Sequence, residues 1–399
     1  MAPDEKPYRV YRGGRAKGKV PTTPRPGSQK SDAAGGRGTG GRGGGAPPGE
    51  YRGPGARRKS GKPRWGRRIA IVAVLVLLLV VVWAVASWFA FSSGVADANK
   101  RLDLDAKAAL DHQGGLLLSH STTILMLGTD NNPNVAARAG DMHSDSILLL
   151  RTDPAHHRLY YLSIPRDLQV PIPGQGTQKI NAAFQFGGPT LAIKTIRQFT
   201  GLAINHVIIV NFGAFRDLID AVGGITVNVP KPIRSNRFDC PFASQARCNT
   251  WQGWRFHTGP QHMNGERALI YSRIRENLLD PAESDVTRGA RQQAVIDATA
   301  AKFTSLGVLV GLPFDGGSLA KPLTTDLTAA QLVQLGWVKF RTSNSDTIHC
   351  RLGGDLGAGG GGSPSEDNPA TIAMFLGKSA LQPPTGPFNP GCVAGHTLQ

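Results

Sequence analysis

The chain has 399 residues and a formal net charge of +17, with 45 Lys and Arg residues against 28 Asp and Glu residues. Residues 1–68 hold 18 basic and four acidic residues, whereas the other 331 residues hold 27 and 24. Because the larger part is nearly neutral, the net charge does not indicate a nucleic-acid-binding domain there, and we expect no nucleic-acid partner.

Residues 1–68 are rich in Gly, Pro, Arg and Lys, and they include the run GGRGTGGRGGG at 35–45. A segment of this composition cannot bury enough apolar surface to offset the entropy lost on ordering. We therefore expect a disordered, basic tail. Arg- and Gly-rich tracts can bind RNA, but the position of this one directly before a hydrophobic run favours contact with anionic lipid headgroups.

The uncharged run IAIVAVLVLLLVVVWAVASWFAF occupies residues 69–91. Its 23 residues are enough to cross a bilayer, and Trp88 and Phe89 lie near its end, where aromatic rings favour the membrane interface. A cleaved signal peptide is the alternative, but the run is too long and the segment before it too extended. Seven basic residues between 57 and 68 predict a cytoplasmic N terminus and an extracellular region after residue 91.

Residues 92–121 are expected to form an extracellular stalk, because they combine helical spacing of leucines with no long apolar face. From residue 122 onward, strand-like and helix-like segments alternate, which predicts an α/β domain with helices on both faces of the sheet. The domain is expected to span 122–385, followed by a C-terminal tail at 386–399. Strands are expected at 123–128, 145–153, 157–165, 204–212, 225–230 and 347–351, and helices at 179–188, 189–201, 213–224, 263–275, 287–303, 327–340 and 369–377.

Four cysteines fit an extracellular domain, where disulfides persist. Three pairings are possible, and the natural one joins near neighbours, Cys240 with Cys248 and Cys350 with Cys392. A zinc site is the competing interpretation, but the cysteines lack the close spacing of zinc ligands.

Arginines cluster in two segments, YSRIR at 271–275 and RGARQQ at 288–293, and SIPRD at 163–167 adds another. The planar guanidinium fork binds phosphate oxygens in pairs, so the cluster indicates a site for a polyanion. The alternative is a solvated helix surface with salt bridges, for which Asp280 and Asp285 are the available partners.

Aspartates lie where predicted strands meet loops, at Asp130, Asp145 and Asp167. Ligands of open α/β sheets collect at strand ends, and carboxylates there can hold Mg²⁺ against phosphate oxygens. For each aspartate taken alone, a role in forming a turn or capping a helix is the more common interpretation, and the metal site gains support only from the arginines.

Seven ordered motifs resemble the LytR-CpsA-Psr family: LMLGTD, SDSILLL, SIPRD, KINAAFQFGG, AVGGITVNV, MNGERALIYSRIR and RGARQQ. The resemblance covers about residues 122–302, and the tail, single span and outer domain also match, in an actinobacterial style. It implies a layered α-β-α domain with a central mixed sheet. It also implies a phosphotransferase that moves a glycopolymer from a polyprenyl pyrophosphate carrier onto peptidoglycan through a phosphodiester bond.

Transferring the family motifs gives the expected site. Asp130 and Asp145 would hold Mg²⁺, and Asp167 would be structural. The catalytic residues would be Asp130, Asp145, Arg166, Arg273 and Arg291. The pyrophosphate-binding residues would be Arg138, Arg166, Lys179, Asn181, Arg273, Arg275, Arg288, Arg291 and Gln292. Two departures from the family pattern are the long loop around Arg138 and Ala182, where a histidine is common.

Two other functions use the same features. A non-catalytic protein would bind the lipid pyrophosphate through the same arginines. A membrane-bound transcriptional regulator would need a DNA-binding motif in the cytoplasmic part, and residues 1–68 contain no helix-turn-helix pattern. The transferase interpretation names three partners: the polyprenyl-pyrophosphate-linked glycopolymer, the peptidoglycan acceptor and membrane lipid.

Overall fold

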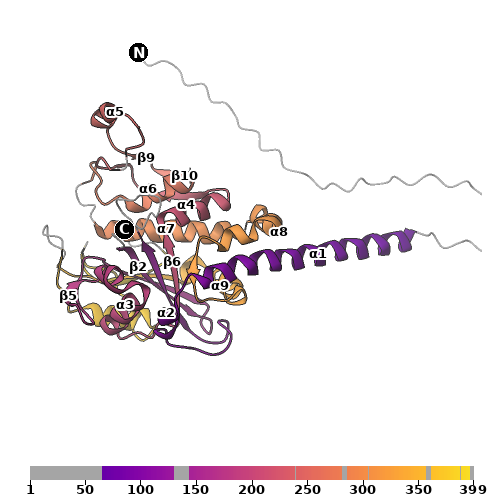
Figure 1. The fold of residues 1–399 in the computed structure, drawn as a ribbon, viewed down its shortest axis with the longest axis horizontal. Helices are drawn as coiled ribbons and strands as arrows, with labels where there is room; N and C mark the ends of the chain where they lie inside the picture. The colour runs from indigo at the N-terminus through magenta and orange to yellow at the C-terminus, as the bar shows by residue number, and fades with distance from the viewer. Residues whose placement is uncertain are drawn as a thin grey trace, which may run out of the picture. The chain divides into compact units, whose positions relative to one another are not determined.

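A seven-stranded mixed sheet forms the centre of the molecule in this computed structural model (Figure 1). The structure describes residues 65–129, 143–238, 240–280, 285–303, 305–355, 361–386 and 388–395. Of the predicted basic tail at 1–68, residues 1–64 lie outside the described residues, and 65–68 are helical. The strand order is β11-β6-β1-β2-β3-β12-β13, with β1 parallel to β6 and β3 parallel to β12, and the other pairs antiparallel. The strands are β1 (Thr122–Thr129), β2 (Ser144–Asp153), β3 (Arg158–Ile164), β6 (His206–Asn211), β11 (Thr324–Thr325), β12 (Thr347–Arg351) and β13 (Gly391–Ala394).

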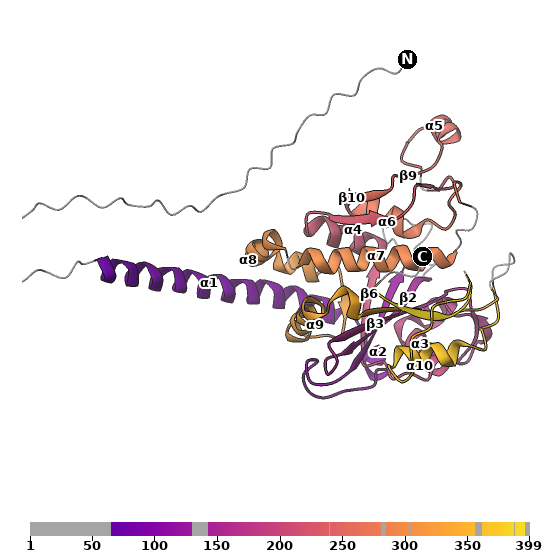
Figure 2. The ribbon, with the colours of Figure 1, turned by 180° about the vertical axis from the view of Figure 1, so that it is seen from behind.

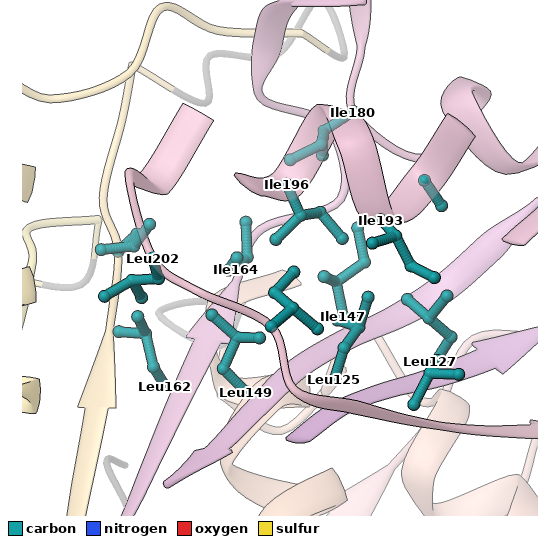
Figure 3. Close-up of a cluster of buried hydrophobic side chains, with 14 of the residues drawn as sticks. Leu125, Leu127, Ile147, Leu149, Leu162, Ile164, Ile180, Ile193, Ile196 and Leu202 are labelled. Atoms are coloured by element: carbon teal, nitrogen blue, oxygen red, sulfur yellow. The ribbon is translucent and has the colours of Figure 1, made fainter. Parts of the chain in front are cut away.

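Helices cover both faces of this sheet. Successive side chains of a strand point to opposite faces, and both faces carry apolar residues that must be buried. Leu125, Ile147 and Leu162 face α3 (Ala182–Thr200), as Figure 3 shows, and α2 (Leu104–Ala108) and α10 (Asn368–Phe375) complete that layer. Ile124 and Leu148 face the other way, onto α7 (Asp285–Phe303) and α9 (Ala329–Arg341). The predicted layered α-β-α fold is confirmed.

A second hydrophobic cluster lies above the sheet, around α4 (Phe212–Ala221) and α6 (Gly265–Arg273). These helices pack with α7 and with the paired strands β7 (Ile225–Val229) and β10 (Gly259–Met263), as Figure 2 shows from behind. Helix α7 therefore touches two cores, with Val295 in the upper cluster and Ile296 against the sheet. The smaller elements are β4 (Gln169–Ile172), β5 (Gly176–Lys179), β8 (Ile233–Arg234), α5 (Gln245–Thr250) and β9 (Arg255–Phe256).

The longest helix, α1 (Trp65–Lys100), is long and apolar enough to cross a membrane. Its 36 residues extend about 54 Å at 1.5 Å per residue, well beyond the roughly 30 Å hydrocarbon core. The large apolar residues of its N-terminal two thirds are exposed, which fits a single-pass membrane anchor. A further helix, α8 (Leu306–Ala320), packs against the domain end of α1.

The structure places two domain boundaries differently from the sequence prediction. Residues 92–121 do not form a separate stalk: Leu102 and Leu110 are buried in the main core, and Asp111 accepts a 2.6 Å hydrogen bond from Arg197 of α3. The predicted C-terminal tail also enters the fold, because 391–394 pair with β12 as an edge strand.

Both predicted disulfides are confirmed. Cys350 lies directly opposite Cys392 in the β12–β13 pair, so this bond fastens the edge strand to the sheet. Cys240 and Cys248 close a short loop around α5.

Candidate functional site

The site forms where β2 begins and β3 ends. Asp145 is the second residue of β2, and Pro165 ends β3 and starts a turn that carries Arg166. Arg166 donates a hydrogen bond to the carboxylate of Asp145. Its Nε lies 3.5 Å from Asp167, whose carboxylate in turn lies 3.2 Å from the Lys179 ammonium. Asp167 thus pairs with two cations, which supports its structural role, and Arg166 is held against the wall of the site.

Helix α7 presents Arg288 and Gln292 on one face, because residues four apart are neighbours on a helix. The Ser146 hydroxyl of β2 donates a 2.8 Å hydrogen bond to Oε1 of Gln292. Helix α7 can also approach β3 closely because residue 289 is glycine: a Cβ there would lie 3.0 Å from Oγ of Ser163. The start of α7 is therefore fixed against the ends of β2 and β3.

Helix α6 lies within the helix predicted at 263–275. It follows Asn264, whose Oδ1 accepts a 2.9 Å hydrogen bond from the Arg267 amide, and it ends at Arg273. The Arg273 guanidinium lies over the Phe212 ring, 4.5 Å from its centroid, and 5.7 Å from that of Phe238. Stacking on aromatic faces orients a guanidinium without neutralising it.

These elements enclose a cavity of about 340 Å³ with two chemically different ends. The charged end lies at Ser146 and at Arg288 of α7. Val295 follows Arg288 by seven residues, about 10 Å along the helix, so the α7 part of the apolar lining lies away from Arg288, whereas Phe212 and Phe238 contact Arg273. The polar lining comprises Asp145, Ser146, Asn236, Ser272, Arg273, Arg275, Arg288 and Gln292, and the apolar lining comprises Met126, Leu127, Leu148, Val210, Phe212, Phe215, Phe238, Leu269, Val295 and Ile296.

A smaller hollow of about 30 Å³ adjoins the charged end. It shares Asp145 and Arg288 with the large cavity and adds Arg166 and Arg351. Burial lowers the pKa of Arg351 to about 10, and its guanidinium donates to the carbonyl of Asn389 at 3.0 Å. It stays charged at neutral pH and adds positive potential beside Asp145.

The structure thus brings together six of the predicted residues on the walls of the two hollows: Asp145, Arg166, Arg273, Arg275, Arg288 and Gln292. Among the described residues, three others lie beside or behind these walls. Arg291 is 6% exposed and donates to the carbonyl of Ile274, which ties α7 to the end of α6. Lys179 pairs with Asp167, and Asn181 donates its backbone N–H to the carbonyl of Arg166. Asp130 and Arg138 lie outside the described residues.

The sequence motifs did not identify three residues of the site: the two rings that contact Arg273, and Arg351. Phe212 follows β6 and Phe238 lies in the loop before Cys240, and no sequence motif indicated that either ring contacts Arg273. Arg351 is an isolated arginine at the end of a strand, without neighbouring basic residues to mark it. Only the tertiary contacts bring these three side chains to the site.

The LytR_cpsA_psr family model matches residues 85–351. The chain belongs to this family. The fold also resembles solved LytR-CpsA-Psr structures: TagT bound to LIIa-WTA is 26% identical, with a TM-score of 0.50 over 66% of this chain and 94% of that one. Bacillus subtilis TagV is 24% identical, with a TM-score of 0.50 over 65% and 99%.

Two curated proteins that resemble this LytR-CpsA-Psr protein are named polyisoprenyl-teichoic acid--peptidoglycan teichoic acid transferase TagU. The protein from Bacillus cereus is 28% identical over 268 residues, which cover 66% of this chain and 80% of the relative. The protein from Bacillus anthracis is 32% identical over 218 residues, which cover 54% and 64%.

Proposed function

We propose that this chain is a membrane-anchored transferase that moves a glycopolymer from a polyprenyl pyrophosphate carrier onto peptidoglycan through a phosphodiester bond. One observation carries the proposal: a single cavity joins an arginine-lined end to an apolar end. A polyprenyl pyrophosphate has the same two parts, a diphosphate and a hydrocarbon chain. The names of the TagU relatives and the fold shared with TagT bound to LIIa-WTA support this assignment.

The reaction exchanges one P–O bond for another. A hydroxyl oxygen of peptidoglycan attacks the phosphorus that carries the glycopolymer, and the bond from that phosphorus to the bridging oxygen breaks. Polyprenyl phosphate leaves with the bridging oxygen and its electron pair, and the hydroxyl proton passes to a base or to water. Phosphoryl transfer of this kind needs charge stabilisation and positioning more than covalent chemistry.

The arginines are arranged for that task. Arg273 is oriented by the Phe212 ring before any ligand binds, and Arg288 is 6% exposed and so is largely desolvated. Charges fixed in a low-dielectric site act more strongly on a developing negative charge than the same charges in water. Arg275, which is exposed, extends the cationic wall outward.

We propose Mg²⁺ as the cofactor, with Asp145 as one ligand; the described residues contain no group of three or more His, Cys, Asp or Glu side chains that could hold a metal on their own. Asp145 is the acidic residue on the walls of both hollows, and its carboxylate is held by Arg166. Mg²⁺ is commonly held by one or two protein carboxylates together with substrate phosphates, so Asp145 with Asp130 would be a sufficient protein contribution. The ion would neutralise charge on the diphosphate.

We place the N terminus in the cytoplasm and the catalytic domain outside the cell. Seven basic residues between 57 and 68 precede the apolar run, and basic residues next to a span remain on the cytoplasmic side. The two disulfides of the domain support the same orientation, because disulfides persist in oxidising compartments.

The test uses the full-length protein in liposomes with a polyprenyl-pyrophosphate-linked glycopolymer, peptidoglycan fragments and Mg²⁺, and measures release of polyprenyl phosphate. We expect release by the native protein and its loss in Asp145→Asn and Arg288→Ala, whereas Gln175→Ala, in an exposed turn remote from the cavity in sequence, keeps it. Donor binding without any release by the native protein would identify a non-catalytic binder and refute the proposal.

A further inference from the structure

Helix α8 exposes large apolar side chains that the catalytic domain leaves uncovered. Leu306, Val310 and Phe314 are 77%, 60% and 87% exposed, and Leu309 is 40% exposed. Successive members of the series 306, 310 and 314 are four residues apart, so they share one side of the helix. A contiguous apolar surface of this kind marks contact with a partner or a membrane.

Helix α9 carries a second exposed apolar stripe. Val333, Trp337 and Phe340 are spaced by four and three residues and are 53%, 50% and 64% exposed. The Trp337 and Phe340 rings stack with their centroids 5.7 Å apart. Tryptophan next to basic residues such as Arg341 is typical of a membrane–water interface.

Both helices are fastened to the part of α1 that adjoins the domain. Nε1 of Trp83 donates a 3.2 Å hydrogen bond to the carbonyl of Val310. Further along, Gly94 meets Gly317 so closely that a Cβ on Gly94 would lie 2.4 Å from the Gly317 oxygen. One small cluster joins Val95 of α1 to Ala320 of α8 and Ala329 of α9. Both α8 and α9 lie near the domain end of α1 in the two views of Figures 1 and 2.

These contacts set the depth of α8 relative to the membrane span. Trp83 precedes Phe91, the last residue of the uncharged run, by eight residues, about 12 Å along the helix. Val310, bonded to Trp83, therefore lies at a level of α1 that is inside the hydrocarbon core when 69–91 cross the bilayer. Charged groups gather at the other end, where Arg101 donates to the carbonyl of Lys321 and both side chains are exposed.

We propose that the exposed face of α8, defined by Leu306, Leu309, Val310 and Phe314, is seated in the bilayer leaflet nearest the catalytic domain, and that the α9 stripe of Val333, Trp337 and Phe340 lies at the membrane–water interface of that leaflet. Lipid is the occupant because these faces continue the apolar surface of α1, itself a membrane-spanning helix. Asp315, which is exposed beyond Phe314 on the side toward Lys321, then lies near the headgroups. The domain is held to the membrane by three helices instead of a single tether.

This seating places the cavity next to the bilayer. Val295 of the cavity wall packs in the same hydrophobic cluster as Val308 and Leu312 of α8, and Ile296 packs with Leu332 of α9. On the basis of the proposed transferase function, the hydrocarbon chain of the carrier then has an apolar route from the leaflet to the cavity.

The test measures lipid contact directly and needs no turnover. Full-length variants Leu306→Cys and Phe314→Cys are labelled with a fluorophore and reconstituted in liposomes, with Gln175→Cys as the matched exposed control. We expect phospholipids with acyl-chain quenchers to quench the two α8 labels severalfold more than the control label, and aqueous iodide to show the reverse order. Equal iodide quenching at Leu306 and Gln175 would overturn the proposal.

A second copy of the chain is the other possible occupant of these faces. In that case the α8 labels would be shielded from both quenchers, and the shielding would fall as the protein-to-lipid ratio is lowered, which would also overturn the proposal. The unmodified protein gives a check that needs no cysteine variant: photolysis of a diazirine-bearing phospholipid should crosslink peptides 306–320 and 329–341. Absence of crosslinks there, with crosslinks present in 69–91, would contradict lipid contact even if the transferase activity is intact.

Discussion

Replacement of Arg273 tests the charged end of the cavity. Its guanidinium, fixed over Phe212, has the planar fork that binds two phosphate oxygens. Hydrogen bonds to charged groups contribute about 1.5–3 kcal/mol, so we expect Arg273→Ala to lower kcat/KM for polyprenyl phosphate release by roughly 10- to 150-fold. Arg273→Lys keeps the charge but loses the fork and the ring stacking, so it should recover part of this loss.

Arg267→Ala is the matched control for this experiment. Arg267 also lies on α6 and stacks on a phenyl ring, with its guanidinium 4.4 Å from the centroid of Phe256. It lines a separate surface hollow, so its removal should leave kcat/KM near the native value. Native turnover in Arg273→Ala, or an equal loss in Arg267→Ala, would refute the assignment of the charged end.

Three further predictions follow from the fold and the site. In denaturant titrations, Cys350→Ser with Cys392→Ser should lower the free energy of unfolding by about 4 kcal/mol, whereas loss of the Cys240–Cys248 disulfide should lower it by about 2.5 kcal/mol, because it closes a shorter loop. Equal losses would contradict this dependence on loop length. Gly94→Leu should separate α1 from α8 and destabilise the protein by about 1–3 kcal/mol in thermal melts, and an unchanged melting temperature would contradict that packing. Chelation of divalent cations should abolish polyprenyl phosphate release, and Mg²⁺ should restore it unless Asp145 is replaced by Asn; full activity in chelator would exclude the cofactor.

The sequence predicted the central fold because its signals are local. The apolar runs of β1, β2 and β3 predict buried strands directly, and α6 lies within the helix expected at 263–275. The cysteine pairs were also found from their spacing. Apart from Cys350 and Cys392, which are 42 residues apart, these features depend on residues that are close together in the chain.

Helix α8 could not be predicted in this way. It contains four internal glycines and Pro313, residues that disfavour helices in isolation. Glycine at 316 and 317 instead lets α8 approach Phe91 and Gly94 of α1 closely, so tertiary packing overrides propensity. The same reason explains β13, which becomes a strand only because β12 and a disulfide lie beside it.

The candidate site also has features that the sequence predicts and features that depend on tertiary packing. The motifs identified Asp145, Arg273 and Arg288, which the fold brings to one cavity from three elements. They did not reveal that Arg291 faces a backbone carbonyl, or that Phe212 orients Arg273. Those features depend on how α4, α6 and α7 pack, and side-chain direction on a helix is set by that packing.

The most direct test of the central claim is analysis of the product. The reconstituted full-length protein, supplied with lipid-linked glycopolymer, peptidoglycan and Mg²⁺, is followed by muramidase digestion and mass spectrometry of the fragments. The account predicts fragments that carry the glycopolymer through a phosphodiester, formed in proportion to released polyprenyl phosphate and absent with Arg288→Ala. Intact lipid-linked donor, with no phosphodiester-linked fragment from the native protein, would contradict it.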